Sequence, residues 1–149
     1  MFRKVLLAIV LAVGVSCAYA DAPDFDAIFK AQVAEAKKQV GVISRADVVK
    51  MIQEKQKFII VDVREADEIK IFGKIDWPEQ KNLSRGKLEP MLAKSGLKVD
   101  DKILVHCKTG ARAALAAKTL KEFGFKNIQI IDGGMDKWLE ENLPALDCV

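Results

Sequence analysis

The chain has 149 residues, of which 50% are hydrophobic and 30% charged, the composition of one globular domain rather than of a disordered segment. Its 24 basic and 21 acidic side chains give a formal net charge of only +3 without a basic patch, so nucleic acid is not expected as a partner. Three cysteines and one histidine are too few for a structural zinc site or a disulfide framework, so we expect no metal and no cofactor, and any chemistry depends on few residues.

Residues 1–20 have the pattern of a secretory signal peptide. Arg3 and Lys4 precede an apolar run from Val5 to Val15, which is shorter than the roughly 20 residues of a spanning helix. Small residues then end at Ala18-Tyr19-Ala20, and we expect cleavage after Ala20. The mature chain would then be periplasmic or secreted, in an oxidising compartment and without membrane attachment. Lipoprotein processing at Cys17 ranks lower, because the preceding residues lack the usual leucine, and a buried N-terminal helix ranks lower still.

An amphipathic helix is predicted from Asp24 to Val40, because apolar residues recur there at helical spacing between acidic residues at the start and lysines at the end. We assign it a packing role. Residues 21–41 are therefore interpreted as an N-terminal helical extension and residues 42–146 as the main domain. A second helix start is marked by Ser44, whose hydroxyl precedes Asp47 by three residues.

Strands and helices then alternate. Short apolar runs predict strands buried on both faces of a parallel sheet at residues 58–61, 102–106 and 127–131. Helical stretches bounded by glycine or proline are predicted at residues 65–72, 88–95, 111–123 and 135–142. This alternation predicts an α/β fold with a parallel sheet.

The candidate chemistry follows the middle strand, where Cys107-Lys108-Thr109-Gly110-Ala111-Arg112 runs from a strand end into a helix. Ligands of open α/β sheets bind beyond such carboxyl ends. Successive backbone N–H groups at a helix N-terminus bind anions, and together with basic side chains they lower the pKa of a cysteine thiol below its ordinary value of about 8.5. An inert buried cysteine is the alternative, but two basic residues and a glycine in the next five positions favour a reactive one.

His106 is the only histidine, and its side chain is expected on the opposite face of the strand from Cys107. We interpret it as structural, which excludes a cysteine protease with a Cys-His pair.

At this point the sequence resembles the rhodanese family of sulfurtransferases, over residues 43–144. The resemblance is carried by four motifs in order: Asp62-Val63-Arg64-Glu65, Asn82 to Glu89, the loop from Cys107 to Arg112, and Asp132 to Trp138. It implies a single domain with an about five-stranded, mostly parallel sheet, helices on both faces, and a cysteine that carries sulfur as a persulfide.

By this resemblance Cys107 is the nucleophile, and Lys108, Thr109, Gly110, Ala111 and Arg112 form the substrate-binding loop. Arg85 is a further substrate-binding candidate. Asp62 and Arg64 are assigned a structural role, although Arg64 is also a candidate for a secondary role near the cleft.

The segment from Lys74 to Lys81 departs from the family pattern, and Trp77 and Pro78 are expected to reshape one cleft wall. This departure puts the identity of the acceptor in question more than the reaction.

The reaction expected from the resemblance is transfer of sulfane sulfur through a Cys107 persulfide. The donor would be a small anion such as thiosulfate, and the acceptor a thiol, a protein thiol included, or cyanide. Two alternatives stay open. One is a non-enzymatic secreted sulfur carrier or protein-binding module. The other, ranked lower, is a Cys-dependent phosphatase or arsenate reductase, whose loop has five residues between Cys and Arg where this chain has the four from Lys108 to Ala111.

Cys148, next to the C-terminus, is the only cysteine besides Cys107 in the expected mature chain. It is either a tail residue without a role, or a thiol that resolves the Cys107 persulfide or protects it as a disulfide under oxidation.

Overall fold

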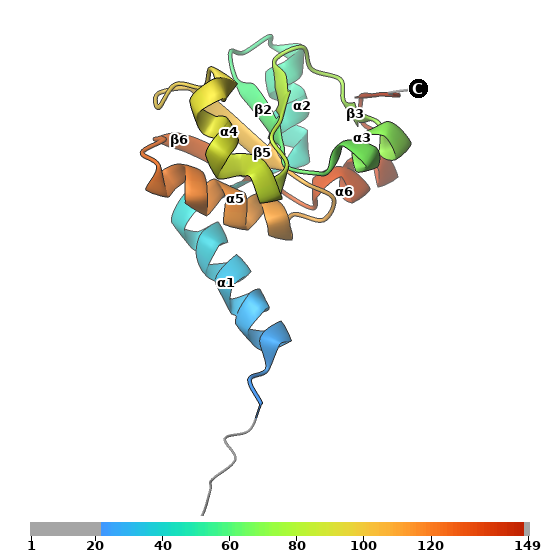
Figure 1. Cartoon of the computed structure of the whole chain (residues 1–149). Coiled ribbons are helices and arrows are strands. Elements are labelled where there is room, and N and C mark those ends of the chain that lie inside the picture. The colour runs from blue at the N-terminus through green and yellow to red at the C-terminus, as the bar shows by residue number, and fades with distance from the viewer. Residues whose placement is uncertain (1–21, 148–149) are drawn as a thin grey trace, which may run out of the picture.

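A central sheet of five parallel strands organises the protein (Figure 1), whose computed structural model describes residues 22–147. The predictions for residues 1–20 and for Cys148 lie outside these residues. The strand order is β1-β6-β5-β2-β4. The strands are β1 (Val42–Ile43), β2 (Ile59–Asp62), β4 (Gln80–Asn82), β5 (Lys102–His106) and β6 (Asn127–Ile131). The α/β class and the five-stranded parallel sheet are thereby confirmed.

Six α-helices surround the sheet in the described part of the chain, with one short 3-10 helix, η1 (Arg85–Lys87). They are α1 (Phe25–Val40), α2 (Arg45–Gln53), α3 (Ala66–Phe72), α4 (Leu88–Ser95), α5 (Ala111–Glu122) and α6 (Gly134–Glu140). A separate antiparallel pair joins β3 (Lys74–Ile75) to β7 (Ala145–Leu146).

Alternate residues of the central strands face two apolar layers, as the two-residue period of a strand requires. On one face Ile103, Val105 and Cys107 pack with residues of α1, α4 and α5. On the other face Leu104 packs with residues of α2 and α6. Helices therefore cover both sides of the sheet (Figure 1). Successive side chains at the end of β5 face opposite layers, Leu104 one layer and Val105 the other.

Helix α1 is packed into the first of these layers. Ala36 is fully buried, and Val33 and Val40 pack against the same cluster. Four buried alanines of α5, namely Ala113, Ala114, Ala116 and Ala117, leave room for close approach to the neighbouring helix and to the sheet.

Candidate active site

Cys107 immediately follows β5 and begins the loop that leads into α5. Its side chain lies on the α5 side of the sheet and is only 1% exposed. The backbone N–H of Gly110 donates a hydrogen bond to Cys107 Sγ over 3.1 Å. Gly110 has φ +104°, a conformation that other residues rarely adopt, and this turn allows its N–H to point back at the sulfur. A donor placed in this way stabilises a thiolate more than a thiol.

The start of α6 closes on the same loop from the other side. The backbone N–H of Met135 donates to the Cys107 carbonyl over 2.8 Å, and that of Asp136 donates to the Lys108 carbonyl over 3.0 Å. Gly134 permits this approach, because a Cβ there would lie 2.5 Å from the Cys107 carbonyl oxygen. The backbone at Cys107 is thus held between the starts of α5 and α6.

Arg112 is held by a residue that the sequence did not single out, Glu68 of α3. Its Nη1 and Nη2 donate to the two carboxylate oxygens over 2.6 and 2.7 Å. Glu68 also accepts from the backbone N–H of Glu65, so that it caps its own helix. The hydrogen bond from Arg112 lowers the pKa of Glu68 from 4.5 to about 2, and the same contact raises the pKa of Arg112. An ionised carboxylate therefore faces the guanidinium beside the cysteine loop.

The other predicted loop residues differ in exposure. Lys108 and Thr109 are exposed, and Lys108 Nζ lies 5.4 Å from the centre of the Phe72 ring of α3. Ala111 is partly buried at the start of α5. The loop thus carries two cations, an exposed Lys108 and an Arg112 that is held by Glu68.

Arg85 lies apart from this loop. Its Nη1 donates to Glu89 over 2.9 Å, and its Nη2 lies 3.4 Å from Oγ1 of Thr119, which is buried on α5. The structure thus brings Lys108 to Arg112 together around Cys107 and places Arg85 against the flank of α5.

Asp62 and Arg64 form a buried ion pair at the end of β2. Arg64 Nη2 donates to Asp62 Oδ2 over 2.6 Å and to the Gly73 carbonyl over 2.8 Å, and both side chains are at most 1% exposed. The Asn82 amide donates to the carbonyls of both residues. This network joins β2, β4 and the end of α3, an arrangement that fits a structural role.

His106 faces the layer opposite Cys107 and is fully buried. Its Nε2 lies 3.5 Å from Asp62 Oδ2 on the paired strand, and neither ring nitrogen has a hydrogen-bond partner among the described residues. Burial lowers its pKa below 6.5, so the ring is neutral at pH 7. It is not placed to exchange a proton with the Cys107 thiol.

Trp77 does not line the wall of the cysteine loop, contrary to the expectation for the segment from Lys74 to Lys81. Its ring stacks on Phe58 with centroids 4.4 Å apart, and its indole N–H donates to the Phe58 carbonyl. Phe58 precedes β2, whereas the loop follows the opposite, carboxyl end of β5. The Trp77 ring, which both stacks and donates a hydrogen bond there, is partly buried against the core.

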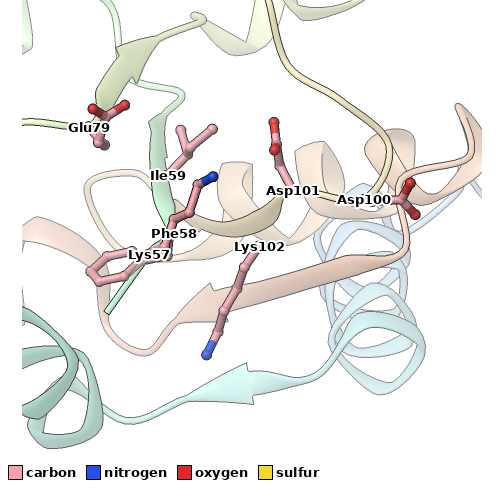
Figure 2. Close-up of a pocket in the computed structure, with 7 residues that line it drawn as sticks. All are labelled: Lys57, Phe58, Ile59, Glu79, Asp100, Asp101 and Lys102. Atoms are coloured by element: carbon pink, nitrogen blue, oxygen red, sulfur yellow. The ribbon is translucent and has the colours of Figure 1, made fainter. Parts of the chain in front are cut away.

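A hollow of about 410 Å³ also lies at the amino ends of β2 and β5 (Figure 2). Its lining carries charges of both signs, among them Lys57, Glu79 and Asp101. It lies at the edge of the sheet away from Cys107, and the mixed charge gives no preference for an anion.

Among residues 22–147 no group of three or more His, Cys, Asp or Glu could hold a metal ion. No helix within these residues is long and apolar enough to cross a membrane.

Comparisons with known proteins identify relatives of this chain. The sequence profile of the family described as "Rhodanese-like domain" matches residues 44–141. The polysulfide-sulfur transferase homodimer of Wolinella succinogenes has a similar structure, with a TM-score of 0.71 and 55% identity, over 83% of this chain and 90% of that one.

Two curated relatives are sulfurtransferases. The adenylyltransferase and sulfurtransferase UBA4 of Candida albicans is 32% identical over 66% of this chain, and the thiosulfate sulfurtransferase YnjE of Escherichia coli is 28% identical over 57% of it. The chain spans only 23% and 18% of the length of these two proteins.

Proposed function

Because the chain belongs to the rhodanese-like domain family, whose members compared above are sulfurtransferases, we propose that it moves sulfane sulfur from a small anionic donor to a thiophilic acceptor. The observation that carries this proposal is the Gly110 N–H at 3.1 Å from Cys107 Sγ, at the start of a helix and beside Arg112. Such a site stabilises a sulfur anion, whether it is the thiolate or the persulfide formed from it.

The reaction has two steps. The Cys107 thiolate attacks the outer sulfur of the donor, the S–S bond of the donor breaks, and the leaving group departs with the electron pair: sulfite from thiosulfate, or a shortened chain from a polysulfide. The outer sulfur of the Cys107 persulfide is then attacked by the acceptor, and the thiolate returns as leaving group. This is covalent catalysis with two half-reactions.

Arg112 and Lys108 bind the anionic donor in this scheme. Only one N–H on each Nη of Arg112 is engaged by Glu68, so the guanidinium keeps donors for a second anion. Lys108 is exposed on a flexible stem and reaches the donor as a point charge.

Polysulfide is favoured over thiosulfate as the donor, because the relative at 55% identity is a polysulfide-sulfur transferase. An intact-mass measurement tests this: each donor is added over a concentration series, and a gain of about 32 Da, one sulfur atom, reports the persulfide. We expect polysulfide to load Cys107 at lower concentration than thiosulfate, with no gain in Cys107→Ser. Loading by neither donor would contradict sulfur transfer.

Measuring repeated sulfur transfer to a small acceptor distinguishes an enzyme from a sulfur carrier. We expect loaded protein to lose the added sulfur to cyanide or to a small thiol repeatedly. A persulfide that forms but is not released to these acceptors would favour a carrier that delivers to a partner protein. Hydrolysis of an aryl phosphate dependent on Cys107 would favour the phosphatase alternative.

We also propose that residues 1–20 direct export and are removed after Ala20, and that the protein, like its relative from Wolinella succinogenes, forms a homodimer. A periplasmic product whose N-terminal sequence starts at Asp21 is the expected result for export.

A further inference from the structure

The apolar residues of α1 form one continuous stripe along the helix, but the rest of the protein covers only the C-terminal half of this stripe. Its C-terminal half contributes Val33, Ala36 and Val40 to the core. Its N-terminal half carries Phe25, Ile28 and Phe29, which are 75%, 46% and 44% exposed. These three residues form what we term the α1 overhang.

The overhang extends beyond the start of α5, at the end of the molecule that holds the cysteine loop. Near the C-terminus of α1, Lys121 Nζ of α5 donates to the Gln39 carbonyl. At the other end, Ala111 lines a groove of about 260 Å³ with Phe29 and Val33 of α1. The two helices therefore run in the same direction, and the first turns of α1 project past α5 (Figure 1). Ala111 belongs to the loop that begins at Cys107, so this groove adjoins the candidate active site.

Two helical turns with exposed aromatic and aliphatic side chains are not stable alone in water. The overhang is nevertheless a capped helix, because the Asp24 side chain accepts from the Ala27 N–H. A contiguous exposed apolar patch on such an element marks an interaction surface.

The charges beside the overhang fit a second copy of the same chain. Asp26 and Lys30 lie one turn apart on one flank of the stripe, with 2.6 Å between their charged atoms. In an antiparallel two-fold contact centred on Ile28, Asp26 of each copy lies opposite Lys30 of the other, so the surface is complementary to itself. Two helical turns bury less than the roughly 1,200 Å² of a stable interface. A stable dimer contact would therefore need to extend over the groove beside Ala111, which would bring the partner close to the cysteine loop.

We propose that the α1 overhang is the homodimer interface, with α1 of a second copy packed antiparallel on Phe25, Ile28 and Phe29. This inference rests on the homodimer included in the proposed function, but its test does not depend on sulfur transfer.

Analytical ultracentrifugation over a concentration series tests it. We expect the purified protein to be a dimer and the Ile28→Glu/Phe29→Glu variant to be a monomer with an unchanged circular dichroism spectrum. Ile71→Glu is the matched control, since Ile71 is an isoleucine 73% exposed on α3, and it should remain a dimer. Asp26→Lys and Lys30→Asp should each raise the dimer Kd several-fold, and the double swap should restore it.

A wild-type protein that is monomeric at tens of micromolar would overturn the inference. A monomer that sediments with phosphatidylglycerol vesicles would overturn it as well, because the overhang would then bind a membrane surface. So would an Ile28→Glu/Phe29→Glu variant that stays dimeric. Sulfur loading of Cys107, measured by mass on the same samples, is a separate readout. A dimer of this kind that fails to load sulfur would contradict sulfur transfer but not the interface. A monomer that loads sulfur would contradict the homodimer and its interface but not sulfur transfer.

Discussion

Cys107 Sγ accepts one N–H bond from its own loop, while its carbonyl oxygen is held by the start of α6. Both the side chain and the backbone of Cys107 are therefore held by hydrogen bonds, and the apolar layer around the side chain excludes water. In such surroundings a fixed N–H donor and a nearby guanidinium act strongly on a sulfur anion, because little solvent screens them.

Cys107→Ser should reduce sulfur transfer to cyanide below about 1% of the wild-type rate, because a hydroxyl oxygen is not ionised at neutral pH and cannot carry sulfane sulfur. The hydroxyl still fits the space of the thiol and still accepts from the Gly110 N–H, so the unfolding midpoint should change little. Thiocyanate formation and thermal unfolding measure the two effects. Substantial residual turnover would show that another residue carries the sulfur.

Glu68 shows where local sequence reasoning reaches its limit at this site. The loop from Cys107 to Arg112 is a continuous motif, and its residues could be singled out from their spacing alone. Glu68 lies 44 positions before Arg112, and only the packing of α3 beside the loop brings the two together. The sequence offered one signal: Glu68 follows Glu65 by three residues at a helix start, the spacing of a capping box.

The Glu68–Arg112 pair should give the protein an acid-dependent part of its stability. The folded-state pKa of Glu68 is about 2 against an ordinary 4.5, so the pair stabilises the fold fully above pH 4.5, and this contribution is lost as the pH falls from 4.5 toward 2. Glu68→Gln keeps the capping geometry and removes the charge. The difference in unfolding midpoint between wild type and variant should be constant from pH 7 to 5 and shrink below 4.5. A difference that does not vary with pH would show that the charge contributes nothing.

At the scale of elements, long and strongly patterned segments were predictable and short ones were not. The strands at residues 102–106 and 127–131 have the predicted bounds, because uninterrupted apolar runs between turns have few alternatives in an α/β fold. Strand β4 is Gln80-Lys81-Asn82, a polar edge strand without an apolar pattern, and β1 has only two residues. Backbone pairing with β2 and β6 defines these strands, and a pattern of side chains cannot reveal it.

Gly134 controls how closely α6 approaches the cysteine loop, and Gly134→Ala tests this contact. Gly96 is the matched control: both glycines have positive φ, +61° and +71°, but a Cβ at Gly96 meets nothing within 4 Å. Gly96→Ala should cost about 1 kcal/mol of unfolding free energy from backbone strain alone. Gly134→Ala should cost roughly 1–3 kcal/mol more, from overlap with the carbonyls of Cys107 and Lys108, and should slow sulfur transfer. Urea unfolding and thiocyanate formation measure both. Equal losses of unfolding free energy in the two variants would show that the cysteine loop shifts to accommodate the added methyl group at little energetic cost.

At the scale of the whole molecule, the buried side chains indicate whether residues 21–41 fold as a separate extension or together with the main domain. Ala36 of α1 is fully buried in the same cluster as residues of β5 and α5. A helix whose side chains complete a core is part of the folding unit, whatever its position in the sequence. The structure therefore favours one cooperative unit that includes the second half of α1 but not the α1 overhang.

Ala36→Glu and Ala31→Glu test whether α1 belongs to the folding unit. Both place the same side chain on the same helix, but Ala36 is 0% exposed, whereas Ala31 lies on the exposed side. Ala36→Glu should reduce the unfolding free energy by about 3 kcal/mol or more, because it forces a carboxylate into an apolar layer or detaches the helix. Ala31→Glu should stay within roughly 0.5 kcal/mol of the wild type. Urea unfolding followed by circular dichroism gives both values. If α1 were a detachable extension, the two variants would unfold at the same urea concentration, and the cooperative unit would begin at β1.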